Sequence, residues 1–124
     1  MLFARYLTHR KDHFSASGNY VKPRAFLPAP RDKKTSVFHI DSLDEREIWE
    51  IGEHYVTRPY GKTLYGRGDI LEAEIEKTGL TVEYDNTPPR HANIAGWPDE
   101  KSKQMSLAQE LAAASELKLR LQEL

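Results

Sequence analysis

Two histidines and a few arginines are the residues of this sequence best suited to acid–base chemistry. His13 lies in the basic N-terminal part of the chain, and His91 lies in its last third. Histidine titrates near neutral pH, so the two can supply the general base and the general acid of metal-independent RNA cleavage. A cation beside the phosphorane is also needed, and Arg67, Arg24 or Arg90 can provide it. Under one of two candidate functions, an endoribonuclease of the small-toxin type, His91, His13 and Arg67 are the expected catalytic residues.

The positive charge of the chain is concentrated at its N-terminal end. Residues 1–35 hold eight Lys or Arg against two Asp, whereas the rest of the chain holds ten against seventeen Asp or Glu. A basic segment of this kind can bind an anion or nucleic acid, but it can equally be solvated, dock on its own acidic body or contact an acidic partner. The candidate ligand-binding residues are Lys22, Arg24, Arg90 and Trp97.

The two candidate functions belong to different classes. The favoured one is a small binding or accessory module that contacts an anionic ligand, such as RNA, or a protein partner, because catalysis would need three distant residues to converge. The endoribonuclease is the alternative. The net negative charge of the body argues against tight RNA binding by the whole surface, although not by a local groove.

The composition indicates one globular domain and narrows the chemistry. The 124 residues are 39% apolar and 30% charged and include no cysteine, which excludes a disulfide framework, a thiol nucleophile and a thiolate metal site. His9 and His13 have a spacing that metals use on helices, but no third ligand is nearby, so we expect no metal and no cofactor. No apolar run approaches the roughly 20 residues that cross a bilayer, so we expect no membrane association and a cytoplasmic location.

Three segments have the composition and alternation of β-strands. In the last of them Ala92 and Ile94 share one face, so His91 points the other way, towards solvent, a cleft or a second layer. The segments are residues 36–40, 80–84 and 90–95.

A helix is predicted at about residues 43–56, with Ser42 and Glu45 as its capping box. Its apolar residues recur at helical spacing, and the acidic residues between them are expected to form a solvated face. A second, shorter helix is predicted at about residues 70–78, with Asp69 as its N-cap.

Gly66-Arg67-Gly68 precedes the second helix. It predicts a structural turn, with an anion site formed by backbone N–H groups as the other interpretation.

The pattern from Asp99 to Leu124 is helical, rich in Ala and Leu. A helix of this length is longer than a domain of this size needs. It either projects and contacts a protein partner or a second copy of the chain, or folds back across the sheet, and the sequence favours neither.

Together these elements predict an α+β fold with a small mixed or antiparallel sheet, two short helices and a long C-terminal helix. Residues 1–98 are expected to form the α+β domain with its basic N-terminal segment. Residues 99–124 are expected to form the amphipathic C-terminal helix of the same domain.

One extended motif carries a resemblance. Pro88-Pro89-Arg90-His91-Ala92-Asn93-Ile94-Ala95-Gly96-Trp97-Pro98, preceded by Val21-Lys22-Pro23-Arg24-Ala25-Phe26-Leu27-Pro28 and Ser36-Val37-Phe38, resembles a group of short uncharacterised bacterial proteins. The resemblance covers most of residues 13–98. It implies a bacterial or mobile-element origin and, because the group has no established activity, it implies no catalytic residue.

Overall fold

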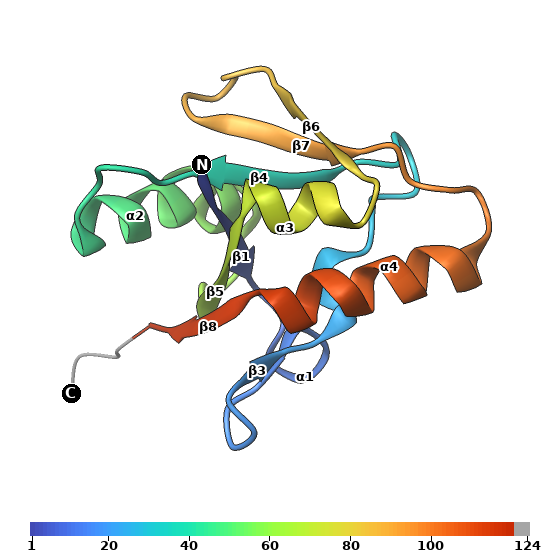
Figure 1. Ribbon diagram of the computed structural model, residues 1–124. Helices are drawn as coiled ribbons and strands as arrows, with labels where there is room; N and C mark the ends of the chain where they lie inside the picture. Colours follow the sequence, from blue (N-terminus) through green and yellow to red (C-terminus); the bar gives the residue numbers. More distant parts are fainter. Residues whose placement is uncertain (121–124) are drawn as a thin grey trace.

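An antiparallel sheet of six strands forms the centre of an α+β fold. The computed structural model describes residues 1–120. The strands are Leu2–Leu7 (β1), Phe14–Ser15 (β2), Tyr20–Val21 (β3), Thr35–His39 (β4), Gly66–Leu71 (β5), Thr81–Tyr84 (β6), His91–Ala95 (β7) and Glu116–Leu119 (β8). The order in the main sheet is β6-β7-β4-β1-β5-β8, and β2 and β3 form a separate hairpin (Figure 1). The predicted α+β class is confirmed.

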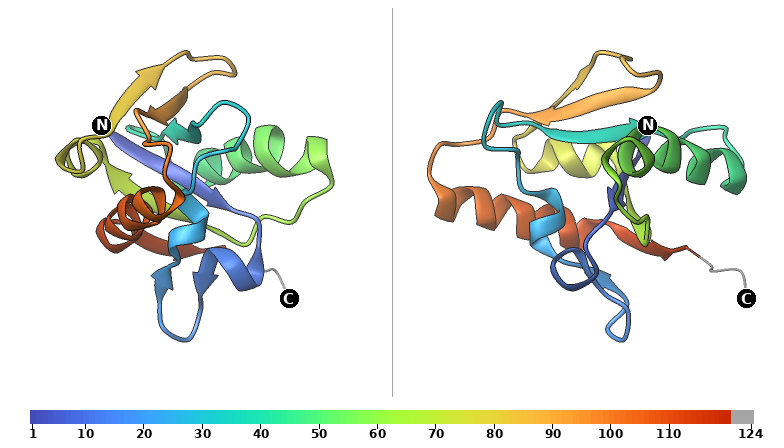
Figure 2. Two further views of the ribbon diagram at one scale, coloured as in Figure 1. Left: turned by 90° about the vertical axis from the view of Figure 1, so that its right-hand side faces the viewer. Right: turned by 180° about the vertical axis from the view of Figure 1, so that it is seen from behind.

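Helical segments cover both faces of this sheet. They are Arg10–His13 (α1), Pro23–Phe26 (η1), Glu45–Ile51 (α2), Gly52–Thr57 (η2, a π-helix), Arg58–Tyr60 (η3), Glu72–Lys77 (α3) and Lys101–Ala114 (α4). Helices α2 and α4 lie on opposite sides of the sheet (Figure 2). The sheet is therefore the middle layer.

Two hydrophobic cores fill the spaces between these layers. The larger core contains Phe3 from β1, Ile75 from α3 and Leu111 from α4. The smaller core contains Tyr6 from β1 and Ile48 from α2, and the Tyr6 hydroxyl donates to the Ile48 carbonyl at 2.6 Å. Side chains of β1 alternate between the two cores, as the period of a strand requires.

The strands β1 and β4 are paired over only a short part of their length. The register of β1 with β4 contains two residue pairs, Phe3 with His39 and Ala4 with Phe38, whereas β1 is paired with β5 along its full length. Beyond these pairs Arg5 takes over the contact to β4, with Nη1 donating to the Ser36 carbonyl at 2.9 Å. Burial lowers the pKa of Arg5 to about 10.

The central strand β1 is the element that the sequence analysis missed. None of the three predicted strand segments lies within residues 1–34, which contain β1, β2 and β3. Both faces of β1 are covered, so its sequence lacks the alternation of apolar and polar residues that reveals a half-exposed strand.

The first predicted helix is present with a different start. Its N-cap is Asp44, whose carboxylate accepts from the Glu47 backbone N–H at 2.8 Å, while the Glu47 side chain accepts from the Asp44 backbone N–H. The predicted cap, Ser42, lies before the helix with a φ of 65°. The capping-box pattern was right in kind but shifted by two residues.

The Gly66-Arg67-Gly68 segment is a strand and not the predicted turn. It opens β5, and the following helix α3 begins at Glu72 without a side-chain cap from Asp69. A Cβ at Gly66 would lie 2.7 Å from the Lys118 carbonyl of β8. This glycine permits the close approach of a neighbouring strand, which is a role that glycine also has inside sheets.

The C-terminal helix α4 is shorter than predicted. It ends at Ala114, and the Ser115 hydroxyl donates to the Ala112 carbonyl at 2.8 Å before the chain continues as edge strand β8. Ala108, Leu111 and Ala112 of α4 are in the larger core, so the helix folds back on the sheet. The predicted helical residues 121–124 lie outside the described part of the chain. No helix within residues 1–120 combines the length and apolar character needed to span a membrane.

Candidate functional site

Three polar side chains form a hydrogen-bonded chain on one face of the sheet. Ser36 Oγ lies 2.9 Å from His91 Nε2, and His91 Nδ1 lies 2.7 Å from Asp85 Oδ1. An ionised carboxylate only accepts, so Nδ1–H donates to Asp85 and Nε2 accepts from the Ser36 hydroxyl. We call this arrangement the Ser36–His91–Asp85 chain. It is the order of groups that activates a serine nucleophile: hydroxyl, base and a carboxylate that orients the base.

The pairing of β4 with β7 brings the serine and the histidine together. In this ladder Ser36 is opposite Asn93, and Phe38 is opposite His91. Side chains two residues apart in a strand share a face, so Ser36 and Phe38 point the same way. The His91 ring packs edge-on against Phe38, with 5.2 Å between centroids. The backbone carbonyl of Ser36 accepts a hydrogen bond from the Arg5 guanidinium.

The turn between β6 and β7 positions the carboxylate. Asp85 Oδ1 also accepts from the Thr87 backbone N–H at 3.1 Å, and Oδ2 accepts from Asn93 Nδ2 at 3.2 Å. Desolvation raises the pKa of Asp85, but the hydrogen bonds from His91, Thr87 and Asn93 outweigh it and leave the pKa below its ordinary value. Asp85 is therefore an anion at neutral pH and can hold the proton of His91 Nδ1 in place.

The Ser36–His91–Asp85 chain opens into a pocket of about 320 Å³, which Ser36 and His91 line. The π-helical segment η2 contributes Tyr55, whose ring stacks on Phe38 with 6.1 Å between centroids and 14° between planes. Lys62 lies at the same wall, and within residues 1–120 its ammonium group has no carboxylate partner. The pocket thus combines aromatic rings, one cation and a hydroxyl that is hydrogen-bonded to a histidine. π-Helical turns are frequent at functional sites.

His13, the first predicted partner of His91, lies in a different environment. Its Nδ1 accepts from the Thr8 backbone N–H at 3.1 Å, and its ring is 5.7 Å from that of His9. Burial, helped by the charge of Arg5, lowers the pKa of His13 to about 4. At neutral pH His13 is therefore uncharged and not the imidazolium that a general acid requires. No described contact joins it to His91.

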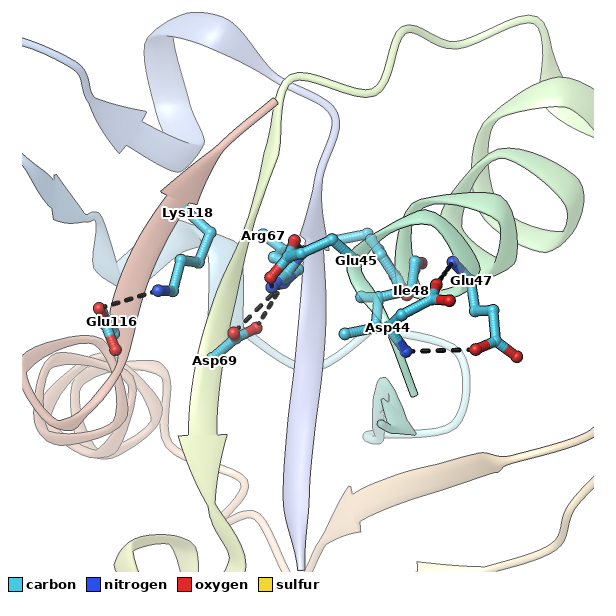
Figure 3. Close-up of polar contacts among 9 residues, drawn as sticks. Asp44, Glu45, Glu47, Ile48, Arg67, Asp69, Glu116 and Lys118 are labelled. Carbon is cyan, nitrogen blue, oxygen red and sulfur yellow. Dashed lines mark hydrogen bonds and ion pairs between the residues drawn. The ribbon is translucent and has the colours of Figure 1, made fainter. Parts of the chain in front are cut away.

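Arg67 is buried and bound to two carboxylates (Figure 3). Its side chain donates from Nε to Asp69 at 2.9 Å and from Nη1 and Nη2 to the two oxygens of Glu45 at 2.9 Å each. The guanidinium carbon also lies 4.6 Å from the centroid of the Trp49 ring. We call these four residues the Arg67 cluster. Each guanidinium nitrogen already has a carboxylate acceptor, so the cluster ties α2 to β5.

The four predicted ligand-binding residues lie in three different places. Trp97 is buried in the larger core. Arg90 donates to main-chain carbonyls at the end of β4. Lys22 and Arg24 line one shallow groove of about 380 Å³ on the basic N-terminal segment. The structure therefore brings only Lys22 and Arg24 together.

Sequence reasoning missed Ser36 and Asp85. The alternation that placed His91 on the outer face of β7 was right, and applied to β4 it would have placed Ser36 on the face of Phe38. The pairing register that joins the two strands, however, cannot be read from either strand alone. Asp85 lies between the predicted strands 80–84 and 90–95, outside every predicted element.

Within residues 1–120, no group of three or more His, Asp or Glu side chains is arranged to hold a metal ion. The chain matches no protein-family model, no curated protein and no solved structure with which it was compared. The function is therefore inferred from the geometry of the site itself.

Proposed function

We propose that this protein is an acyl-transferring enzyme, a hydrolase when water is the acceptor, with Ser36 as its nucleophile. The observation that carries the proposal is the Ser36–His91–Asp85 chain, whose hydrogen bonds of 2.9 and 2.7 Å end at the wall of a pocket. A serine hydroxyl is a weak nucleophile unless a base accepts its proton, and His91 Nε2 is in position to do so. The substrate class is an ester or thioester small enough for this pocket.

In the first step His91 Nε2 takes the proton of Ser36 Oγ while the oxygen attacks the carbonyl carbon of the substrate. The carbonyl carbon then loses its bond to the leaving oxygen or sulfur, which receives the same proton from His91. In the second step His91 removes a proton from water, the hydroxide attacks the acyl-serine, and Ser36 Oγ leaves with the proton. Asp85 stays ionised throughout and stabilises the imidazolium that forms twice.

Negative charge develops on the substrate oxygen in both steps. Lys62 is the cation that lines the pocket, and its ammonium would stabilise that charge. The stacked rings of Phe38 and Tyr55 form an apolar wall for the acyl group. The groups that line the pocket would therefore supply the nucleophile, the base, a cation and a hydrophobic surface. Asp85, which is bound to His91 Nδ1, would supply the orienting carboxylate.

The contacts favour this chemistry over RNA cleavage by His13 and His91. Cleavage of that kind needs a protonated second histidine and a cation at the phosphorane. His13 has its pKa lowered to about 4, and the Arg67 guanidinium is bound to Glu45 and Asp69. His91, in contrast, has both ring nitrogens arranged for serine activation.

The proposal is tested with p-nitrophenyl acetate and p-nitrophenyl butyrate under stopped-flow absorbance. We expect a burst of about one p-nitrophenolate per protein, followed by slow turnover, because an acyl-serine intermediate accumulates. Ser36→Ala should abolish the burst, and His91→Gln should slow it at least about 100-fold.

Ser106→Ala is the matched control, since Ser106 is an exposed serine of α4. A burst that survives in Ser36→Ala with unchanged amplitude would show that another group is acylated. Absence of a burst in the wild type with both esters would also count against the proposal.

A further inference from the structure

Five of the eight cations of the basic N-terminal segment form two groups with different surroundings. Lys34 forms an ion pair of 2.9 Å with Glu83, and Lys33 pairs with Asp99. These two lysines dock on the acidic body of the molecule. Lys11, Lys22 and Arg24 have no carboxylate partner within residues 1–120, so their charge is not neutralised by the described part of the chain.

Lys11, Lys22 and Arg24 line a single groove, which we call the basic groove. It has a volume of about 380 Å³, within the range of small-ligand sites, and it runs between α1, the start of η1 and Met105 of α4. The Lys22 ammonium donates to the Lys11 carbonyl at 2.7 Å, which fixes where its charge lies without reducing it. Asp12 is the one acidic residue that lines the groove, and it pairs with His9.

An exposed aromatic ring lies beside these charges. Tyr20 lines the same groove and is 52% exposed. Its ring packs across the turn of the β2–β3 hairpin, where a Cβ at Gly18 would lie 2.4 Å from Tyr20 Cε2. Glycine at this position leaves room for the ring. The exposed half of the Tyr20 side chain is available for stacking.

We propose that the basic groove binds single-stranded nucleic acid. The cations Lys11, Lys22 and Arg24 would contact successive phosphates, and a base would stack on Tyr20. A cationic groove with an adjacent aromatic platform is the combination that single-stranded binders use. This site is separate from the Ser36–His91–Asp85 chain, and the inference is independent of the acyl chemistry.

The charge distribution favours a short single strand over a duplex. Outside residues 1–35 the chain carries ten Lys or Arg against seventeen Asp or Glu, so a long polyanion would meet repulsion beyond the groove. Three phosphate contacts on a single strand predict a slope of about −2 for log K against log salt, because each contact contributes about −0.7. A duplex offers no exposed base to Tyr20.

The experiment is fluorescence anisotropy of a labelled, mixed-sequence RNA of about 12 nucleotides, titrated with the full chain between about 50 and about 200 mM NaCl. Lys22→Gln/Arg24→Gln removes two groove charges, and we expect affinity to fall at least about tenfold with a salt slope shallower by about 1 to 2. Lys33→Gln/Lys34→Gln is the matched control. It removes the same charge from the self-docked pair, and its effect should stay below about twofold.

Tyr20 separates stacking from charge. Tyr20→Ala should weaken binding about 5-fold to 100-fold with an unchanged salt slope, because stacking contributes about 1 to 3 kcal/mol per base, whereas Tyr20→Phe should bind as the wild type does. Equal losses in the two double variants would show that the attraction is unspecific and overturn the inference. A duplex or a poly-glutamate peptide that binds as tightly as the RNA, or no RNA binding at the lowest salt, would overturn it as well.

Discussion

The Arg67 cluster and the Ser36–His91–Asp85 chain are both networks of titratable side chains, but they differ in where they end. In the first, Arg67 is 1% exposed and its donors point to Asp69 and Glu45. In the second, the carboxylate and imidazole are held in place, and the last hydroxyl lies at a pocket wall. Glu45 is 67% exposed, and residues of the Arg67 cluster also line a pocket, of about 630 Å³. The two networks therefore differ in their donors: every guanidinium nitrogen of Arg67 is bound to a carboxylate, whereas the second network ends in a hydroxyl at a pocket wall.

This difference is the basis on which we propose a structural role for Arg67 and a catalytic role for His91. A buried charge that has all its partners is costly to disturb and has no proton to exchange with a ligand. A histidine whose one nitrogen is fixed by a carboxylate and whose other nitrogen faces a hydroxyl can take up and return a proton without moving. Sequence analysis had assigned catalysis to Arg67 and His91 alike, and only their surroundings distinguish them.

Replacement of Arg67, the centre of the Arg67 cluster, should have the largest effect on stability. Arg67→Met leaves Asp69 buried without its partner, so the free energy of unfolding in urea should fall by about 3 to 5 kcal/mol. The ester burst of the folded fraction should be unchanged. Arg46→Met, which removes an exposed guanidinium paired with Glu50, should cost below about 0.5 kcal/mol.

Replacing both Arg67 and Asp69 tests whether the unpaired buried carboxylate causes the loss of stability. Arg67→Met/Asp69→Leu should recover at least about 2 kcal/mol relative to Arg67→Met, because the unpaired buried carboxylate is gone. A folded Arg67→Met protein that has lost the ester burst would place Arg67 in the catalytic site and contradict its structural role.

Asp85→Asn should have the next largest effect, and on activity instead of stability. The asparagine amide can donate to His91 Nδ1 and favour the tautomer that cannot accept the Ser36 proton. We expect the burst to slow by about 100-fold or more, with a change below about 1 kcal/mol in unfolding free energy, since this carboxylate is half-exposed. A burst rate within about threefold of the wild type would remove Asp85 from the mechanism.

Lys62→Met should have a smaller effect of the same kind. Loss of the ammonium from the pocket wall should slow the burst about tenfold, and Lys62→Arg should retain most of it. Lys77→Met, a surface lysine paired with Glu74, is the control for loss of one positive charge. Identical rates in the Lys62 and Lys77 variants would show that the pocket cation does not contact the developing charge.

The smallest predicted effect is a dependence of stability on pH that arises from His13, the residue first proposed as the partner of His91. The unfolded chain binds a proton at His13 near pH 6.5, whereas burial keeps the folded residue neutral down to about pH 4. Stability from this residue is therefore complete above about pH 6.5 and is lost as pH falls towards 4.

The loss of unfolding free energy that His13 causes on acidification should be about 1 kcal/mol, after allowance for solvent screening of its partly exposed ring. It is measured as the difference between wild type and His13→Gln in unfolding free energy at about pH 7 and about pH 5. A wild type whose stability rises relative to the variant on acidification would mean that His13 is charged in the fold.

Much of the fold was predictable because half-exposed elements leave a local pattern. The alternation in 80–84 and 90–95 predicted β6 and β7 and placed His91 on the outer face. Strands β1 and β5 gave no such pattern, since both of their faces are covered. The residues of edge strand β8 favour helices, so the sequence predicted a helix there. Pairing with β5 overrides that local preference.

The site was less predictable than the fold. Ser36 and His91 are 55 residues apart and meet through the register of β4 with β7. That register depends on which strands are neighbours, and this is a property of the whole sheet. Residue type alone directed attention to arginines and to a second histidine, whereas the proposed site depends on the burial and the partners of each side chain.

The most direct test of the central claim is covalent labelling with a fluorophosphonate probe, followed by mass spectrometry of the intact protein and of its peptides. The probe reports an activated serine whatever the natural substrate is, because phosphorus takes the place of the carbonyl carbon. We predict one adduct per chain, located on Ser36, with labelling slowed at least about 100-fold in His91→Gln. An adduct on another residue, or labelling of Ser36 at the same rate without His91, would contradict the assignment of the Ser36–His91–Asp85 chain as the catalytic site.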